Sequence, residues 1–160
     1  MNQFSENRLL ELKNNFKGKK IAVVGDLMLD GYFRGDVSRI SPEAPVPIVE
    51  VDKEYFRFGG SANVALNIKH LNGTAIPFGV VGTDNDSNIF RSLLEDENIN
   101  DIGIIEDSTR PTTVKVRVIA DNQHIVRIDR ESKDYISKST EEELTGKFSE
   151  LANDLDAVIL

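Results

Sequence analysis

The 160-residue sequence contains no cysteine, and this absence excludes several kinds of chemistry. Without thiols the chain forms neither a disulfide nor a Cys-ligated zinc or iron–sulfur site. A cysteine nucleophile is excluded for the same reason. The length allows one globular domain or slightly more, and a chain of this size buries roughly 68–70% of the surface that its unfolded form exposes.

Histidine is also scarce, since the chain has only His70 and His124. Neither has a second histidine at metal-ligand spacing, so we expect no metal site in this chain. His124 falls at a predicted hairpin turn and is expected to face solvent. The positions of these histidines also give no suggestion of a Ser-His-Asp triad.

Positively charged residues are fewer than negatively charged ones: the chain has 19 Lys and Arg and 27 Asp and Glu, which gives a formal net charge of −8. Nucleic-acid binding needs a basic footprint, so we expect no nucleic-acid partner. The longest apolar runs, such as 21–24, are far shorter than the roughly 20 residues that span a bilayer. The first residues show no basic, apolar leader. The sequence therefore predicts no membrane association and a cytoplasmic location.

Apolar periodicity predicts an alternation of helices and short buried strands. Helices are expected over 4–16, from 59 to about 72, over 87–96 and over 139–153. Buried strands are expected over 20–26, 75–81, 101–106 and 156–160. Strand–helix–strand units in this order predict an α/β fold with a mostly parallel sheet.

Helix ends are also readable in the sequence. Gly73 is expected to end the helix that starts near residue 59, because glycine commonly follows the last helical turn. Ser139 or Thr140 is expected to cap the last helix, with a glutamate three residues later completing a capping box.

Two segments break the α/β pattern. In residues 112–130, Val114, Val116 and Val118 alternate with polar residues, which predicts a β-hairpin. Residues 31–58 alternate partially and contain three prolines, which exclude a central position in a sheet and favour edges or turns. We expect both segments to be antiparallel insertions that pair as one small sheet.

The Gly59–Asn63 stretch, GGSAN, is the first candidate binding element. Paired glycines before a helix let a ligand approach the backbone, and free N–H groups there favour anions or hydroxyls. A plain glycine-rich loop is the alternative.

Asp26 and Asp30 follow a buried strand, at the position where open α/β sheets bind ligands. Asp30 could accept hydrogen bonds from two neighbouring sugar hydroxyls, although either aspartate could instead cap a turn. This region lacks the G-x-G-x-x-G motif of dinucleotide sites, so the sequence gives little support for such a site. The whole chain lacks G-x-x-x-x-G-K-[ST], so a P-loop is excluded.

Cations gather on one predicted strand face. Lys115 and Arg117 share a face of the hairpin strand, Arg127 is expected nearby on its partner, and Arg39 lies in the first inserted segment. Clustered cations in an acidic protein could hold a phosphate. A solvated strand face is the alternative.

Together these motifs resemble the ribokinase-type (PfkB) carbohydrate kinase family. The stretches that carry the resemblance are residues 21–30 (IAVVGDLMLD), 38–47 (SRISPEAPVP), 58–67 (FGGSANVALN), 80–84 (VVGTD) and 111–129. The SRISPEAPVP segment followed by GG-x-A-N-V-A is most similar to the bacterial kinases of this family that phosphorylate D-glycero-D-manno-heptose 7-phosphate at O1.

The resemblance implies a three-layer α/β/α body, formed here by residues 1–30, 59–111 and 131–160. It implies an inserted β lid, formed by residues 31–58 and 112–130, that closes over the sugar and often mediates a homodimer. It also implies that Asp30 binds sugar hydroxyls and that Gly59, Gly60 and Asn63 line the sugar pocket. We expect the 7-phosphate to be bound by cations of the lid, namely Arg39, Lys115 and Arg117.

Members of this family use ATP and Mg²⁺, and they are longer than this chain. Their catalytic base lies in a C-terminal G-A-G-D type motif, which is absent here, as are the anion hole and most of the ATP site. We therefore expect no catalytic residue in this chain. We interpret it as the N-terminal half of a kinase that serves ADP-heptose and lipopolysaccharide synthesis, and we expect this half to be inactive alone. Another sugar or nucleoside kinase of the family, or a non-catalytic sugar-binding or dimerisation module, is the alternative.

Overall fold

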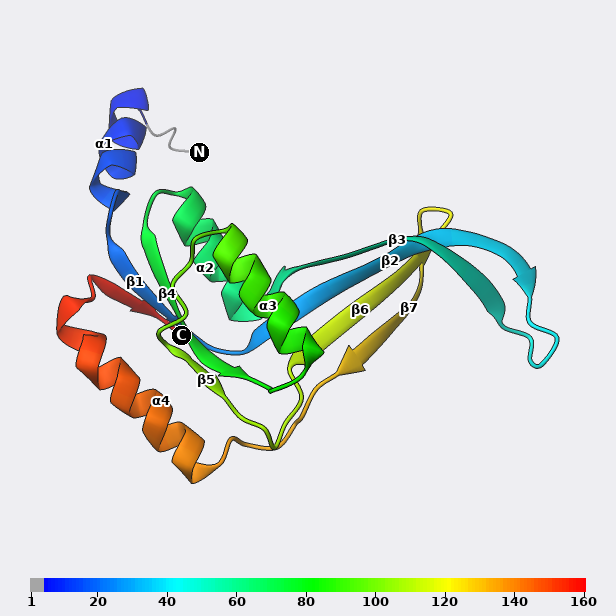
Figure 1. Cartoon of the computed structure of the whole chain (residues 1–160). Helices are drawn as coiled ribbons and strands as arrows, with labels where there is room; N and C mark the ends of the chain where they lie inside the picture. Colours follow the sequence, from blue (N-terminus) through cyan, green and yellow to red (C-terminus); the bar gives the residue numbers. More distant parts are fainter. Residues whose placement is uncertain (1–4) are drawn as a thin grey trace.

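The computed structural model describes residues 5–160 and has a three-layer α/β/α body (Figure 1). Four parallel strands form its central sheet in the order β5-β4-β1-β8. Helices α2 and α3 cover one face of this sheet and α4 covers the other (Figure 1). The strands are β1 (Lys20–Val24), β4 (Thr74–Val81), β5 (Ile104–Glu106) and β8 (Ala157–Ile159), and the helices are α2 (Gly60–His70), α3 (Asn85–Asp96) and α4 (Lys138–Leu151).

Strand β1 shows why the central strands are apolar throughout. Ile21 and Val23 pack with Ala65 and Ile68 on the α2 side. Ala22 points the other way, into a cluster that Phe148 of α4 also joins. Because successive side chains of a strand alternate between faces, a strand covered on both sides must be apolar at every position.

A second sheet forms the lid, in the order β3-β2-β6-β7. It projects from the body, and the β2–β3 hairpin reaches furthest (Figure 1). The two insertions join through a parallel pair between β2 and β6, so the sheet is mixed. Its strands are β2 (Leu27–Ile40), β3 (Pro47–Gly59), β6 (Thr113–Ala120) and β7 (Gln123–Arg130).

The root of the lid is packed against helix α3. Leu29, Phe58 and Val114, one from each of three lid strands, are buried in one cluster with Phe90. The rings of Phe58 and Phe90 meet edge to face, 5.2 Å between centroids. Burial of each such side chain contributes about 1.5–3 kcal/mol. This cluster fixes where the lid leaves the body.

Two predicted helix ends are wrong. Ser137 caps α4: its Oγ accepts a hydrogen bond from the Thr140 backbone N–H at 3.1 Å. Helix α2 ends with Asn72 in the left-handed region (φ 67°), while the Gly73 N–H donates to the Ile68 carbonyl at 3.0 Å. Asparagine tolerates this backbone conformation, so glycine is not required at the turn itself.

The first helix, α1 (Glu6–Phe16), is capped by Ser5, whose Oγ accepts from the Arg8 N–H. Residue 4, included in the predicted helix, lies outside the described residues. A short 3-10 turn, η1 (Ala152–Asp154), follows α4. Within residues 5–160, no helix combines the length and apolar character needed to cross a bilayer.

Candidate functional site

The junction between strand β3 and helix α2 brings backbone close to a carboxylate. Gly59 is the N-cap of α2 and Gly60 has φ 54°, a conformation that favours glycine. A Cβ at Gly59 would lie 3.0 Å from Cγ of Asp30. The Ser61 N–H donates to the Asp26 carbonyl at 3.0 Å. The two glycines therefore allow this helix start to sit against Asp30.

Asp30 lies inside strand β2 rather than in a turn. Its neighbours across the sheet are Arg57 of β3 and Lys115 of β6. Its Oδ1 accepts a hydrogen bond from Nη1 of Arg117 at 2.7 Å, and both side chains are only about one-fifth exposed, at 21% and 23%. This pair joins strands β2 and β6 at the base of the lid.

Lys115 is held by two carboxylates. Its Nζ lies 2.9 Å from Glu131 and 3.4 Å from Asp129. The hydrogen bond to Glu131 raises the pKa of Lys115, and this effect outweighs the opposing effect of partial burial. Arg127 donates two hydrogen bonds to Asp129, which lowers the pKa of that carboxyl. Lys115, Arg117 and Arg127 are thus each paired with a carboxylate.

Arg39 lies near the outer end of β2, opposite Ile48. At about 3.3 Å per residue, its backbone is roughly 30 Å from that of Asp30. Within one chain the structure therefore does not bring Arg39 together with Asp30, Lys115 or Arg117.

A cavity of about 440 Å³ lies between the lid root and helices α2 and α3. Asp30 and Asn63, two of the sequence candidates, line it together. Lys115 and Arg117 do not line it. The complete lining is Asp30, Tyr32, Phe56, Arg57, Phe58, Asn63, Leu66, Leu93 and Glu97.

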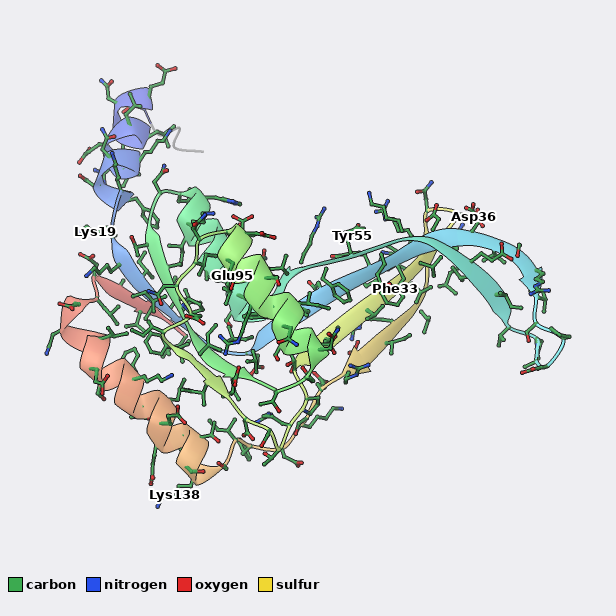
Figure 2. All side chains as sticks on the ribbon, in the orientation of Figure 1. Lys19, Phe33, Asp36, Tyr55, Glu95 and Lys138 are labelled. Atoms are coloured by element: carbon green, nitrogen blue, oxygen red, sulfur yellow. The ribbon has the colours of Figure 1, made fainter. Side chains whose placement is uncertain are left out.

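Sequence reasoning missed Arg57 and the aromatic pair beside it. Tyr32 and Tyr55 stack with centroids 5.0 Å apart, and the Arg57 guanidinium carbon lies 5.3 Å from the Tyr55 centroid. Figure 2 labels Tyr55 on the lid. Only the register of the β2–β3 hairpin places Arg57 opposite Asp30, and the proline-rich turn hides that register in the sequence.

Glu97 is the second carboxylate of the cavity. The Lys69 ammonium donates to it at 2.6 Å, and this hydrogen bond lowers the pKa of Glu97. The negative charge of Glu97 is therefore balanced by a residue of helix α2.

A second cavity, of about 210 Å³, lies at the carboxyl ends of β1 and β4, where α/β sheets bind ligands. Asp26 and Arg110 line it. The Arg110 guanidinium donates to the backbone carbonyls of Ser132 and Asp134. Residues 5–160 contain no group of three His, Asp or Glu side chains that could hold a metal ion.

The sequence of residues 18–156 matches the profile of the pfkB family carbohydrate kinases. The chain belongs to this family. PfkB carbohydrate kinases carry out ATP-dependent phosphoryl transfer, and the three-layer body with its β lid is consistent with this membership.

Among curated relatives, the bifunctional protein HldE of Helicobacter pylori (strain P12) is 47% identical over 142 residues, which are 89% of this chain and 31% of that protein. HldE of Citrifermentans bemidjiense is 41% identical over 86% of this chain and 28% of its own length. The chain therefore spans less than a third of these relatives.

Among solved structures, the tetrameric inhibited form of phosphofructokinase-2 from Escherichia coli aligns with a TM-score of 0.62. The alignment covers 83% of this chain and 41% of that chain, at 21% sequence identity. At this identity the likeness shows the fold, which is ribokinase-like.

Proposed function

We propose that this chain is the sugar-binding and lid part of an ATP-dependent kinase that phosphorylates D-glycero-D-manno-heptose 7-phosphate at O1. The product would feed ADP-heptose and lipopolysaccharide core synthesis in the cytoplasm. The observation that carries the proposal is the cavity in which Asp30 and Asn63 meet beneath the lid. The SRISPEAPVP and GG-x-A-N segments, together with the similarity to HldE proteins, support the choice of sugar.

In this proposal Asp30 accepts hydrogen bonds from sugar hydroxyls. The close approach of Gly59 to Asp30 lets the helix start contact the same sugar, and Asn63 adds amide donors and acceptors. Before the sugar phosphate binds, Arg117 holds the Asp30 carboxylate through the hydrogen bond at 2.7 Å. The lid consists of residues 31–58 and 112–130, and the body consists of residues 1–30, 59–111 and 131–160. The lid closes over the sugar and excludes water from the site between lid and body.

Two of the cations assigned to the 7-phosphate contact it only after rearrangement. Lys115 and Arg117 must exchange their carboxylate partners for the phosphate. Arg39 can reach it only from a second copy, across a lid-mediated homodimer. If Lys115→Ala and Arg117→Ala leave the affinity for the sugar phosphate unchanged, their assigned role is wrong.

The chemical step needs groups that residues 1–160 do not supply. A base must remove the proton of the O1 hydroxyl, and an anion hole must stabilise the charge on the transferred phosphoryl group. We assign both, with ATP and Mg²⁺ binding, to sequence outside this segment, because no G-A-G-D motif occurs here.

The proposal is tested by a coupled kinase assay on the full natural polypeptide with heptose 7-phosphate, fructose 6-phosphate and ribose. Preference for heptose 7-phosphate supports it. Preference for either other sugar indicates a different kinase of the family. Sugar binding without turnover indicates a non-catalytic module.

A further inference from the structure

Arg57 is the cation of the lid that lines the cavity of about 440 Å³, and within residues 5–160 it has no carboxylate partner. It shares a sheet face with Lys115, Arg117 and Arg127, because Asp30 is its cross-strand neighbour. Those three cations each bind a carboxylate. Among residues 5–160, no carboxylate oxygen lies within 4.0 Å of the Arg57 guanidinium.

The aromatic pair beside Arg57 holds its guanidinium in place. The guanidinium carbon lies 5.3 Å from the Tyr55 ring centroid and 5.9 Å from that of Tyr32. A guanidinium over aromatic rings is attracted by their electron density and keeps its N–H edge free. A planar cation held this way can donate two parallel hydrogen bonds to a phosphate at little entropic cost.

Of the three charged side chains that line the cavity, Asp30, Arg57 and Glu97, only Arg57 has no partner of opposite charge among the described residues. Asp30 is paired with Arg117 at 2.7 Å, and Glu97 is paired with Lys69 at 2.6 Å. Asn63 is neutral and the remaining lining is aromatic or aliphatic. The cavity of about 440 Å³ therefore presents one uncompensated positive charge, next to a carboxylate suited to hydroxyls.

We propose that Arg57 binds the phosphate of the incoming sugar phosphate and sets the preference for phosphorylated over unphosphorylated sugar. The assignment depends on the proposed sugar kinase function and refines it. Asp30 and Arg57 are direct cross-strand neighbours on one face, so one sugar can meet both through its hydroxyls and its phosphate.

The test compares wild type, Arg57→Gln and Arg57→Lys in the full natural polypeptide. The substrates are D-glycero-D-manno-heptose 7-phosphate and the same heptose without phosphate. For R57Q, the KM for the phosphorylated sugar is expected to rise roughly 10- to 100-fold, the range for loss of charge-assisted hydrogen bonds. For R57Q, kcat/KM for the unphosphorylated sugar is expected to stay unchanged. R57K keeps the positive charge but loses the two parallel N–H donors of the guanidinium, so its KM for the phosphorylated sugar should lie between those of wild type and R57Q.

Arg34→Gln is the matched control, since Arg34 is an exposed arginine further out on the same face of β2. It should behave as wild type on both substrates. A loss of equal size on both substrates in R57Q, or no loss on either, would overturn the assignment, and R57K decides the question if R57Q fails to fold. Wild-type turnover of neither heptose would instead refute the proposed function, and the assignment with it.

Discussion

Asp84 binds Thr112 through both of its carboxylate oxygens. Oδ2 accepts from the Thr112 backbone N–H at 2.9 Å, and Oδ1 accepts from the Thr112 hydroxyl at 2.7 Å. The same Oδ1 accepts from the Ser87 N–H at 3.0 Å, which caps helix α3. Thr112 is fully buried and directly precedes β6. One carboxylate thus fastens the start of a lid strand to a body helix.

Asp84→Ala is therefore expected to lower the free energy of unfolding by about 2–4 kcal/mol, because a helix cap is lost and a buried N–H and hydroxyl lose their acceptor. Urea unfolding monitored by circular dichroism measures the change. Glu95→Ala, at an exposed position of the same helix, is the control and should change stability by less than about 0.5 kcal/mol. An equal effect of both variants would contradict this account.

The same contact predicts an acid dependence of stability. Burial raises the pKa of Asp84, but the hydrogen bonds from Thr112 and Ser87 outweigh it and leave the pKa below its ordinary value of 3.8. A lowered folded-state pKa adds stability that is present above the unfolded value and is lost as the pH falls through the folded value. The stability difference between wild type and Asp84→Asn should therefore shrink below pH 3.8. Unfolding curves measured from neutral pH downward test this, and a constant difference would contradict it.

Asp30 is expected to be essential for sugar binding. Asp30→Asn removes the charged acceptor and the ion pair with Arg117, and should lower kcat/KM for the sugar phosphate by about 100-fold or more. Steady-state kinetics of the full natural polypeptide measure this loss. Asp36→Asn, an exposed aspartate further along β2, is the control. Similar kinetics for the two variants would remove Asp30 from the site.

The lid has an apolar face opposite its charged face, and we expect the lid-mediated dimer to form through this apolar face. Val126 and Ile128 of β7 are 49% and 54% exposed there, next to Val118 and Val116 of β6. Ile128→Glu should convert the dimer of the full natural polypeptide to a monomer, as measured by light scattering. Tyr135→Ser, at a fully exposed position outside the lid, should leave the dimer intact. A dimer that survives Ile128→Glu would exclude this face.

Residues 1–160 produced alone should not phosphorylate heptose 7-phosphate, since the base and anion hole are assigned to other sequence. Val158 and Ile159 of the edge strand β8 are 44% and 40% exposed, so this edge should also self-associate. A coupled assay and light scattering test both expectations. A measurable rate, or a monodisperse monomer, would contradict the respective expectation.

The fold was predictable where one pattern has one solution. A short apolar run bounded by glycine, such as residues 21–24, favours a strand covered on both faces. The alternation of Val114, Val116 and Val118 with polar residues favours a strand. The cap of α4 was not predictable, because Ser137, Ser139 and Thr140 all have suitable side chains. The path of the chain into the helix selects Ser137, which local sequence does not determine.

The site was predictable only in part for a related reason. Asp30 and Asn63 belong to motifs, so the sequence marks them as candidates, and both line one cavity in the structure. Arg57 belongs to no motif, and its position opposite Asp30 depends on the hairpin register, which two irregularities in the β2–β3 pairing shift. Ion pairs between strands could not be predicted from the sequence either. The carboxylates that bind Lys115 can be identified only once the pairing of β6 with β7 is known.

The central claim is tested most directly by the substrate preference of the full natural polypeptide. Initial rates with ATP should give a kcat/KM for D-glycero-D-manno-heptose 7-phosphate far above the values for fructose 6-phosphate and ribose. Equal or lower kcat/KM for heptose 7-phosphate, or no phosphoryl transfer to it, would contradict the account.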